Sequence, residues 1–308
     1  MNLKFKTVSF AEKEMIDRYA FLYGERSCQH SFVSMFGHSE KYGDAVCEKD
    51  GWLYYCRRNL ETDRTRFYLC PLGDREDSSG FIRAIENILE DAHSDGKKAR
   101  FETVTKSVAE MLETCFPNRF DIRPCRDFYE YIYSREKLVK LPGKKMAKRR
   151  YQVNACLRYY QGRLEIDPIT ESDIPEIKLF QEEWLRERYE ENGNPELLEE
   201  NGAIQRELDE FGRCGLNGII IRLEDEIVGY AYGVCLTDDC FDILVEKGNR
   251  DILHIYRLLK RELPAHCNEK IQWINWEEDV GDPGLRQIKT DYYPDKLMEK
   301  YIVEELCE

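Results

Sequence analysis

The feature of this sequence that most limits its possible folds is the order of its predicted helices and strands, which occurs twice. In each half a helical region precedes three strands rich in β-branched and aromatic residues, and a helix, a strand, a helix and a strand follow. The three strands are expected at 44–49, 52–58 and 65–70 in the first half, and at 217–224, 226–236 and 239–247 in the second. Strands interleaved with helices in this way predict an α/β fold with mixed sheets and helices on both faces. We expect two domains, 1–150 and 151–308.

The element order resembles that of the GNAT (acyl-CoA N-acyltransferase) superfamily. Two copies in one chain resemble the proteins that carry a tandem duplicated GNAT fold, among them aminoacyl-tRNA-dependent transferases. Because one fold hosts many functions, this order alone predicts architecture rather than activity. Evidence for the reaction must therefore come from sequence motifs.

Composition excludes several classes of protein. Hydrophobic residues make up 42% of the chain, which is enough for a packed core, and no window approaches the roughly 18 uninterrupted apolar residues of a membrane span. The N-terminus mixes charges into its apolar positions, unlike a signal peptide, so we expect a cytoplasmic location. None of the twelve cysteines forms a Cys-x-x-Cys pair. We therefore expect reduced, buried thiols and no metal site.

One basic segment contradicts the acidic character of the chain. The net charge is -14, with 60 acidic against 46 basic residues, which argues against general nucleic-acid binding. From Lys137 to Arg158, however, there are eight basic residues and no acidic one. The segment is a candidate contact for an anion or an RNA end, or it is a solvated connector. The basic residues assigned to donor binding here are Lys144, Lys148, Arg149 and Arg150.

The stretch WINWEEDVGDPGLRQIKTDYYP, at 273–294, predicts a strand, a turn and a helix. Arg286 and Lys289 would share one helix face and could converge on one anionic group. The turn would bring Asn275, Glu278 and Asp279 beside the start of that helix, where α/β proteins often place polar site residues. Alternatively, Glu278 or Asp279 caps the helix and pairs with Arg286 as a structural cluster.

The same stretch resembles the phosphatidylglycerol lysyltransferase C-terminal domain family, through Asn-acid-Asp-Gly followed by Gly-Leu-Arg-x-x-Lys. Further matches occur in order along most of the chain: PLG, LPGKKMAKRRYQVN, LNGIIIRLEDEIVGYAYG, VEK and IYRLL. The resemblance implies a duplicated GNAT fold and kinship with enzymes that move an aminoacyl group from charged tRNA to a lipid headgroup or another amine. The chain departs from the family at His254, where a Gly often precedes IYRLL, and it lacks the membrane-embedded half of the lipid-modifying enzymes.

An acyl transfer needs a general base and a cradle for the donor. Glu246 is a candidate base because Asp242 would share its strand face and raise its pKa; Asp279 is a second candidate. Neither half contains the Gly-rich turn on which GNAT enzymes hold coenzyme A, although Arg250 lies at the matching place.

These residues predict an acyl- or aminoacyltransferase whose donor is acyl-CoA or, more in keeping with the missing turn, aminoacyl-tRNA. Its acceptor would be a small molecule or a peptide. The alternative is a non-catalytic anion- or nucleotide-binding, regulatory protein that retains the GNAT fold.

Overall fold

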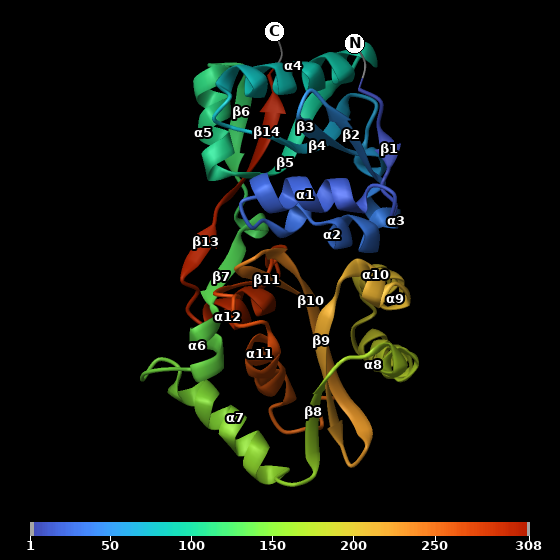
Figure 1. Cartoon of the computed structure of the whole chain (residues 1–308), viewed down its shortest axis with the longest axis vertical. Coiled ribbons are helices and arrows are strands. Elements are labelled where there is room, and N and C mark those ends of the chain that lie inside the picture. The colour runs from blue at the N-terminus through green and yellow to red at the C-terminus, as the bar shows by residue number, and fades with distance from the viewer. Residues whose placement is uncertain (1–2, 307–308) are drawn as a thin grey trace. The chain divides into compact units, whose positions relative to one another are not determined.

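The computed structural model describes residues 3–306 and divides the chain into two compact units. The first unit runs to Glu130 and includes Glu278–Arg286 and the residues from Leu297 onward. The second unit comprises Tyr131–Glu277 and Gln287–Lys296. Each unit is built around one seven-stranded mixed sheet (Figure 1).

In the first unit the strand order is β1-β2-β3-β4-β5-β14-β6. The strands are β1 (Lys6–Thr7), β2 (Asp44–Lys49), β3 (Trp52–Arg57), β4 (Thr65–Leu72), β5 (Lys98–Thr105), β6 (Phe120–Pro124) and β14 (Lys300–Glu305). The helices are α1 (Lys13–Tyr23), α2 (Phe32–Gly37), α3 (Ser39–Tyr42), α4 (Ser78–Ser94) and α5 (Lys106–Cys115). Strands β2 to β4 form an antiparallel meander, and β5 joins β4 in parallel after α4.

The core of the first unit lies between this sheet and helices α4 and α5. Alternate strand residues such as Tyr54 and Tyr68 meet Phe81 and Ile85, which recur at helical spacing on α4. Asp77 caps α4 by accepting the Gly80 N–H at 2.9 Å.

In the second unit the strand order is β13-β7-β12-β11-β10-β9-β8. The strands are β7 (Glu130–Ser134), β8 (Leu164–Pro168), β9 (Asn217–Leu223), β10 (Glu226–Thr237), β11 (Cys240–Gly248), β12 (Trp273–Asn275) and β13 (Lys296–Met298). The helices are α6 (Arg135–Lys140), α7 (Ala147–Tyr159), α8 (Ile174–Asn192), α9 (Glu196–Asp209), α10 (Phe211–Cys214) and α11 (Ile255–His266). Helix α12 (Pro283–Thr290) begins in the first unit and ends in the second. Again an antiparallel meander, β9 to β11, is followed by a helix and by a parallel neighbour, β12.

The two faces of the second sheet differ in chemistry. Helices α6, α7 and α11 cover one face, whereas α8, α9 and α10 cover the other (Figure 1). The face under α11 is apolar and includes Ile219 and Phe241, which form one core cluster with Leu259 of α11. The opposite face is partly polar: the Tyr232 hydroxyl donates a hydrogen bond of 2.7 Å to Glu207 on α9. The duplicated GNAT-like α/β fold predicted from the element order is therefore the fold of this chain.

Each half of the chain contributes a strand to the sheet of the other unit. Strand β7 precedes the second unit's helices and pairs with β12, while β14 at the C-terminal end lies between β5 and β6. Helices α6 and α7 pack against α11. The compact units thus change over at Glu130, not at the expected residue 150, because the basic segment forms helices that contribute to the second core.

Three local features differ from the expectations. The helical region expected before the first three strands is interrupted after Tyr23, because Glu25 and Arg26 adopt the left-handed conformation. Strand β6 was not predicted, and α6 and α7 lie where the sequence indicated a connector or an anion contact. The eleven cysteines among the described residues are free thiols. None of the helices described here is long and apolar enough to cross a membrane.

Candidate functional site

In the second unit, two parallel strands separate at their carboxyl ends. Strand β12 pairs with β11 only over Cys240–Asp242 and ends at Asn275, whereas β11 continues to Gly248 along its other neighbour, β10. Beyond this point Trp276 and Glu277 continue the chain after β12, outside its hydrogen-bonded pairing with β11. Crevices at the carboxyl ends of parallel strands are where open α/β sheets bind ligands. The side chains that surround this separation are therefore candidates for a ligand site.

Glu246 lies on β11 beyond the separation and is held by two donors. Lys260 on α11 approaches its Oε2 at 2.5 Å, and the Trp276 indole N–H donates to the same oxygen at 3.2 Å. The Lys260 ammonium also lies 4.3 Å from the centre of the Trp276 ring. The other oxygen, Oε1, is buried and has no hydrogen-bond partner among the described residues. A carboxylate with one oxygen anchored and one oxygen without a partner still has the capacity to accept a proton or a hydrogen bond.

The expectation that Asp242 and Glu246 share a strand face is wrong. The register between β10 and β11 shifts between Tyr232 and Gly233, whose partners are Val245 and Ile243, so Leu244 is an extra residue in the ladder. Ile243 therefore packs in the apolar cluster under α11, and Glu246 contacts that same helix. Asp242 points to the opposite face, where it cannot act directly on Glu246.

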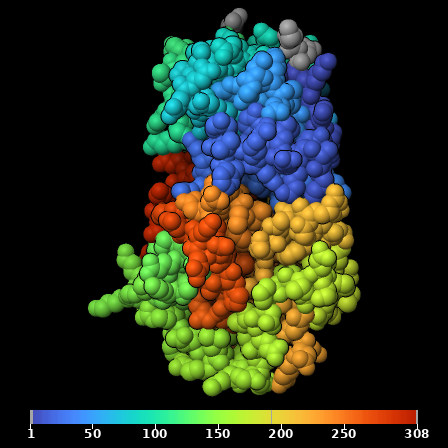
Figure 2. Space-filling view, viewed as in Figure 1, coloured from blue at the N-terminus to red at the C-terminus, as the bar shows by residue number. Residues whose placement is uncertain are grey.

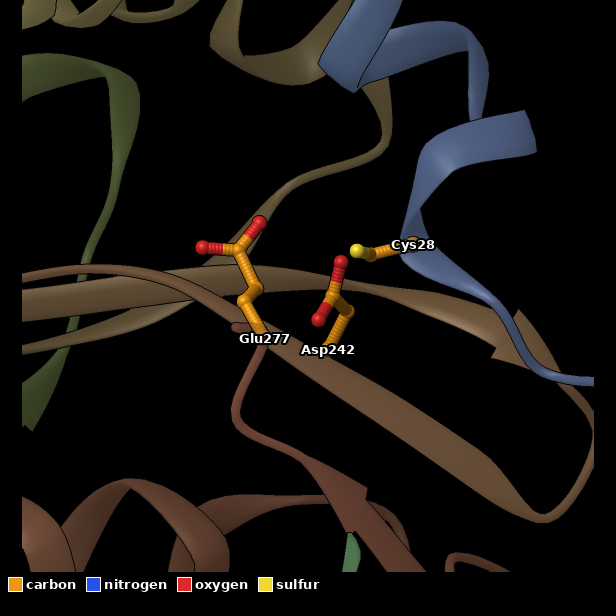
Figure 3. Close-up of side chains that lie close together, drawn as sticks. All are labelled: Cys28, Asp242 and Glu277. Carbon is orange, nitrogen blue, oxygen red and sulfur yellow. The ribbon is translucent and has the colours of Figure 1, made fainter. Parts of the chain in front are cut away.

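Asp242 instead faces Glu277, which follows β12. A carboxylate oxygen of Asp242 lies within 4.8 Å of one of Glu277, and Figure 3 shows both side chains reaching in the same direction. Asn275 is fully buried, and its side-chain oxygen accepts the Glu277 N–H at 2.8 Å. Glu277 has a φ of 47°, a conformation that is uncommon for residues other than glycine.

In the first unit, Asp279 is the centre of an ion-pair cluster. Arg286 binds the buried Asp279 carboxylate in bidentate fashion, at 2.9 Å from Nε and 2.6 Å from a terminal nitrogen. Arg126 donates to it at 3.0 Å, as does the Gly281 N–H. Arg286 also binds Asp127 at 2.7 Å, and its hydrogen bonds to the two carboxylates raise its pKa. The structural pairing considered from the sequence is thus present, while the cap of α12 is Asp282, which accepts the Leu285 N–H.

The other residues of the 273–294 stretch have separate partners. Lys289 is buried, and its ammonium donates to the Trp276 carbonyl at 2.6 Å. Glu278 belongs to the first unit and accepts from the Gln29 amide at 3.0 Å. Arg286 and Lys289 therefore bind different acceptors, although they lie on one helix.

The basic segment divides into structural and exposed residues. Arg149 is buried and pairs with Asp291 at 2.6 Å, and Arg150 donates to the carbonyls of Leu141 and Gly143. Lys144 and Lys148 are exposed, and the segment that leads into α7 projects from the surface in green in Figure 2.

Aromatic side chains accompany these exposed lysines. Tyr151 and Tyr159 on α7 are 64% and 68% exposed, so they are open to stacking. Tyr160 is buried, and its hydroxyl accepts the Leu253 N–H at 3.1 Å in the loop before α11.

The loop between β11 and α11 has its own constraints. Arg250 is exposed and pairs with Glu191 at 3.0 Å. His254 has a φ of 58°, in the left-handed region that favours glycine. The conformation explains why a glycine would suit this position.

Lys260 and Trp276, which anchor Glu246, were not among the residues singled out from the sequence. A signal for Lys260 existed, because it stands beside Leu258, Leu259 and Leu263 on the buried side of the amphipathic helix α11. A charge on an apolar helix face needs a buried partner. No pattern in the sequence identified Glu246 as that partner.

Comparison with known proteins gives the family. The profile described as phosphatidylglycerol lysyltransferase, C-terminal, matches residues 20–304, so the chain belongs to this family. A conserved protein of unknown function from Bacteroides thetaiotaomicron superimposes with a TM-score of 0.90 at 26% identity, over 99% of this chain and 100% of that one.

Two further relatives are more distant. L-PGS from Bacillus licheniformis has a TM-score of 0.68 at 13% identity, over 97% of this chain and 93% of that one, which shows the common fold. An uncharacterized protein of Mycoplasmoides gallisepticum is 23% identical over 180 residues, or 58% of this chain and 56% of that protein. The match to this curated relative thus spans little more than half of its length.

Proposed function

We propose that the protein transfers an aminoacyl group from charged tRNA to an amine or hydroxyl acceptor, and that the reaction takes place where β11 and β12 separate. Membership of a family named for a lysyltransferase supports this reaction class. The observation that carries the proposal is the geometry of Glu246, whose Oε2 is fixed by Lys260 and Trp276 while its buried Oε1 has no hydrogen-bond partner among the described residues.

The proposed step is a direct attack on the ester of the charged tRNA. The acceptor nitrogen or oxygen forms a bond to the aminoacyl carbonyl carbon, and the bond from that carbon to the ribose oxygen breaks. Glu246 accepts the proton that the acceptor loses, and the departing ribose oxygen receives a proton. A general base placed in this way contributes about 10²- to 10⁴-fold to the rate.

Exposed residues of the second unit fit a contact with the donor. Lys144 and Lys148 can neutralise phosphates, and the exposed rings of Tyr151 and Tyr159 can stack on unpaired bases. Arg149 and Arg150 support this surface from beneath through their structural contacts. The acceptor in this proposal is a small molecule or a peptide.

The test is deacylation of charged tRNA in the presence of candidate amine and hydroxyl acceptors. Glu246→Gln keeps the size of the side chain and one acceptor oxygen but removes the base, so we expect turnover to fall at least 100-fold. Glu226→Gln, at an exposed position at the start of β10, is the matched control and should retain full turnover. Equal activity of the two variants would refute the role of Glu246.

A second function, anion binding without turnover, is favoured by the exposed Lys144 and Lys148, because binding of phosphates needs cations but no general base. The guanidinium groups of the Asp279 cluster are already paired with carboxylates, so they do not add to this function. If the wild-type protein binds charged tRNA with a steep dependence on salt but never deacylates it, this second function holds and the transferase fails.

A further inference from the structure

Lys260 is a buried cation whose ammonium is paired with the carboxylate of Glu246. The residue is 7% exposed, and its ammonium lies 2.5 Å from Glu246 Oε2 and above the ring of Trp276. Tyr256, one turn earlier on α11, places a second ring at 5.8 Å. A lysine taken out of water to this extent loses much of its hydration and depends on its counter-ion.

Two glycines allow this contact by bringing α11 close to the sheet. A Cβ atom added at Gly229 on β10 would lie 3.2 Å from the Ile255 side chain, and one added at Gly248 on β11 would lie 3.0 Å from it. Both distances are tighter than ordinary contacts. The small residues therefore let the helix approach until the Lys260 side chain reaches Glu246.

The groups near Lys260 have opposite effects on the pKa of its ammonium. Burial lowers the pKa of Lys260, and the positive charges of Arg257 on α11 and Lys289 on α12 lower it further, while Glu246 on β11 opposes this shift. Arg257 donates to the Tyr292 hydroxyl at 3.2 Å. Of the groups that act on Lys260, Glu246 is the one that holds its proton in place.

We propose that Lys260 is a positioning residue for Glu246 and also stores the proton that the reaction moves. This inference rests on the proposed function. Lys260 and Trp276 fix Oε2, so that Oε1 is presented in one orientation to the acceptor. When Glu246 takes the acceptor's proton and becomes neutral, Lys260 loses its counter-charge, and its own proton becomes easier to release.

Lys260 and Glu246 together return to their starting protonation states at the end of the cycle. The acceptor's proton passes to Glu246, and a proton passes from Lys260 to the departing ribose oxygen. Transfer of a proton from the neutral Glu246 to the neutral Lys260 restores the starting ion pair. Apart from these proton transfers, the only bonds formed and broken are those of the acyl transfer itself.

The coupling can be measured without turnover. The ¹³Cε resonance of Lys260, assigned by its loss in Lys260→Arg, is titrated in the wild-type protein and in Glu246→Gln. We expect the apparent pKa of Lys260 to be at least one unit lower in the variant, because the variant lacks the counter-charge. An unchanged titration would overturn the proposal, whatever the activity of the protein.

Kinetics separates positioning from general stabilisation. Lys260→Met removes the counter-charge of Glu246, so the acid limb of the kcat–pH profile should move to higher pH, with at least a tenfold loss of kcat and little change in KM. Lys260→Arg should leave the limb in place, and Lys270→Met, at an exposed residue, should match the wild type.

Each kinetic outcome has one meaning. If Lys260→Met reduces kcat equally at every pH, Lys260 is merely structural and the proposal is overturned. If the wild-type protein does not deacylate charged tRNA, the proposed function fails and the proton-storage role fails with it. The carbon titration still tests the pairing of Lys260 with Glu246 in that case.

Discussion

A buried ion pair makes the C-terminal strand essential to the first unit. Lys300 on β14 and Glu130 are both fully buried, and the Lys300 ammonium lies 2.6 Å from Glu130 Oε1. Ser27 completes the network, because its hydroxyl donates to Glu130 at 2.9 Å and accepts from Lys300. The Lys300→Met variant keeps the apolar stem of the side chain but leaves Glu130 without this counter-charge.

The expected loss can be estimated from the burial of both partners. Breaking a buried pair by removing one partner costs about 3–5 kcal/mol, out of a typical free energy of unfolding of about 5–15 kcal/mol. At about 2–4 °C per kcal/mol for a domain of this size, the melting temperature should fall by about 6–20 °C. Adding Glu130→Gln to Lys300→Met removes the isolated charge and should recover part of the loss.

Urea denaturation and hydrogen exchange together check this prediction. Denaturation gives the change in free energy, and exchange of the β5 and β14 peptides shows whether the loss is local to the first sheet. Lys296→Met, at an exposed residue, is the matched control and should change stability by no more than about 0.5 kcal/mol. A loss below about 1 kcal/mol in Lys300→Met, with unchanged exchange in β14, would refute the reasoning.

Three further predictions follow from other sites. Burial raises the pKa of Glu207 to about 7 from 4.5, so the stability that this acid contributes is present below pH 4.5 and is lost as the pH rises to about 7. Urea denaturation at several pH values should therefore show that, across that range, the free energy of unfolding of Glu207→Gln rises by about 3 kcal/mol relative to that of the wild type. Arg286→Ala should lower the melting temperature, because the buried Asp279 loses its bidentate partner, whereas Arg250→Ala at an exposed pair should not; equal melting curves would contradict this. A thermal melt with acetyl-CoA should show no upward shift, whereas a ligand at about 100 times its dissociation constant adds roughly 2.7 kcal/mol; a clear shift would identify a CoA donor instead.

The fold could be predicted from the sequence because its information is local. The spacing of apolar residues in α4 and the turns between β2, β3 and β4 depend on neighbours a few residues apart. The exchange of β7 and β14 could not be predicted in this way. Alternating aromatic residues such as Tyr131 and Tyr133 show that a strand has a buried face, but they do not show which sheet it joins.

The candidate site was predicted by residue type rather than by geometry. The sequence identified Glu246 and Asp279 as acids at the ends of strands, which is a matter of position along the chain. Their partners, Lys260 for the first and Arg126 for the second, come from distant segments and fix what each acid can do. Asp279 already accepts hydrogen bonds from two guanidinium groups and a backbone N–H, so its contacts favour a structural role.

The bulge at Leu244 decides which charge controls Glu246. Without it, Asp242 and Glu246 would lie on one face, and repulsion between two carboxylates would raise the pKa of the base. With it, the sheet separates them, and the group in direct contact with Glu246 is the ammonium of Lys260. A neighbouring cation favours the ionised carboxylate, which is the form that can accept a proton. Because Glu246 is also the group that opposes the lowered pKa of Lys260, protonation of the glutamate weakens the hold on the lysine's proton, so the lysine and the glutamate act as one unit.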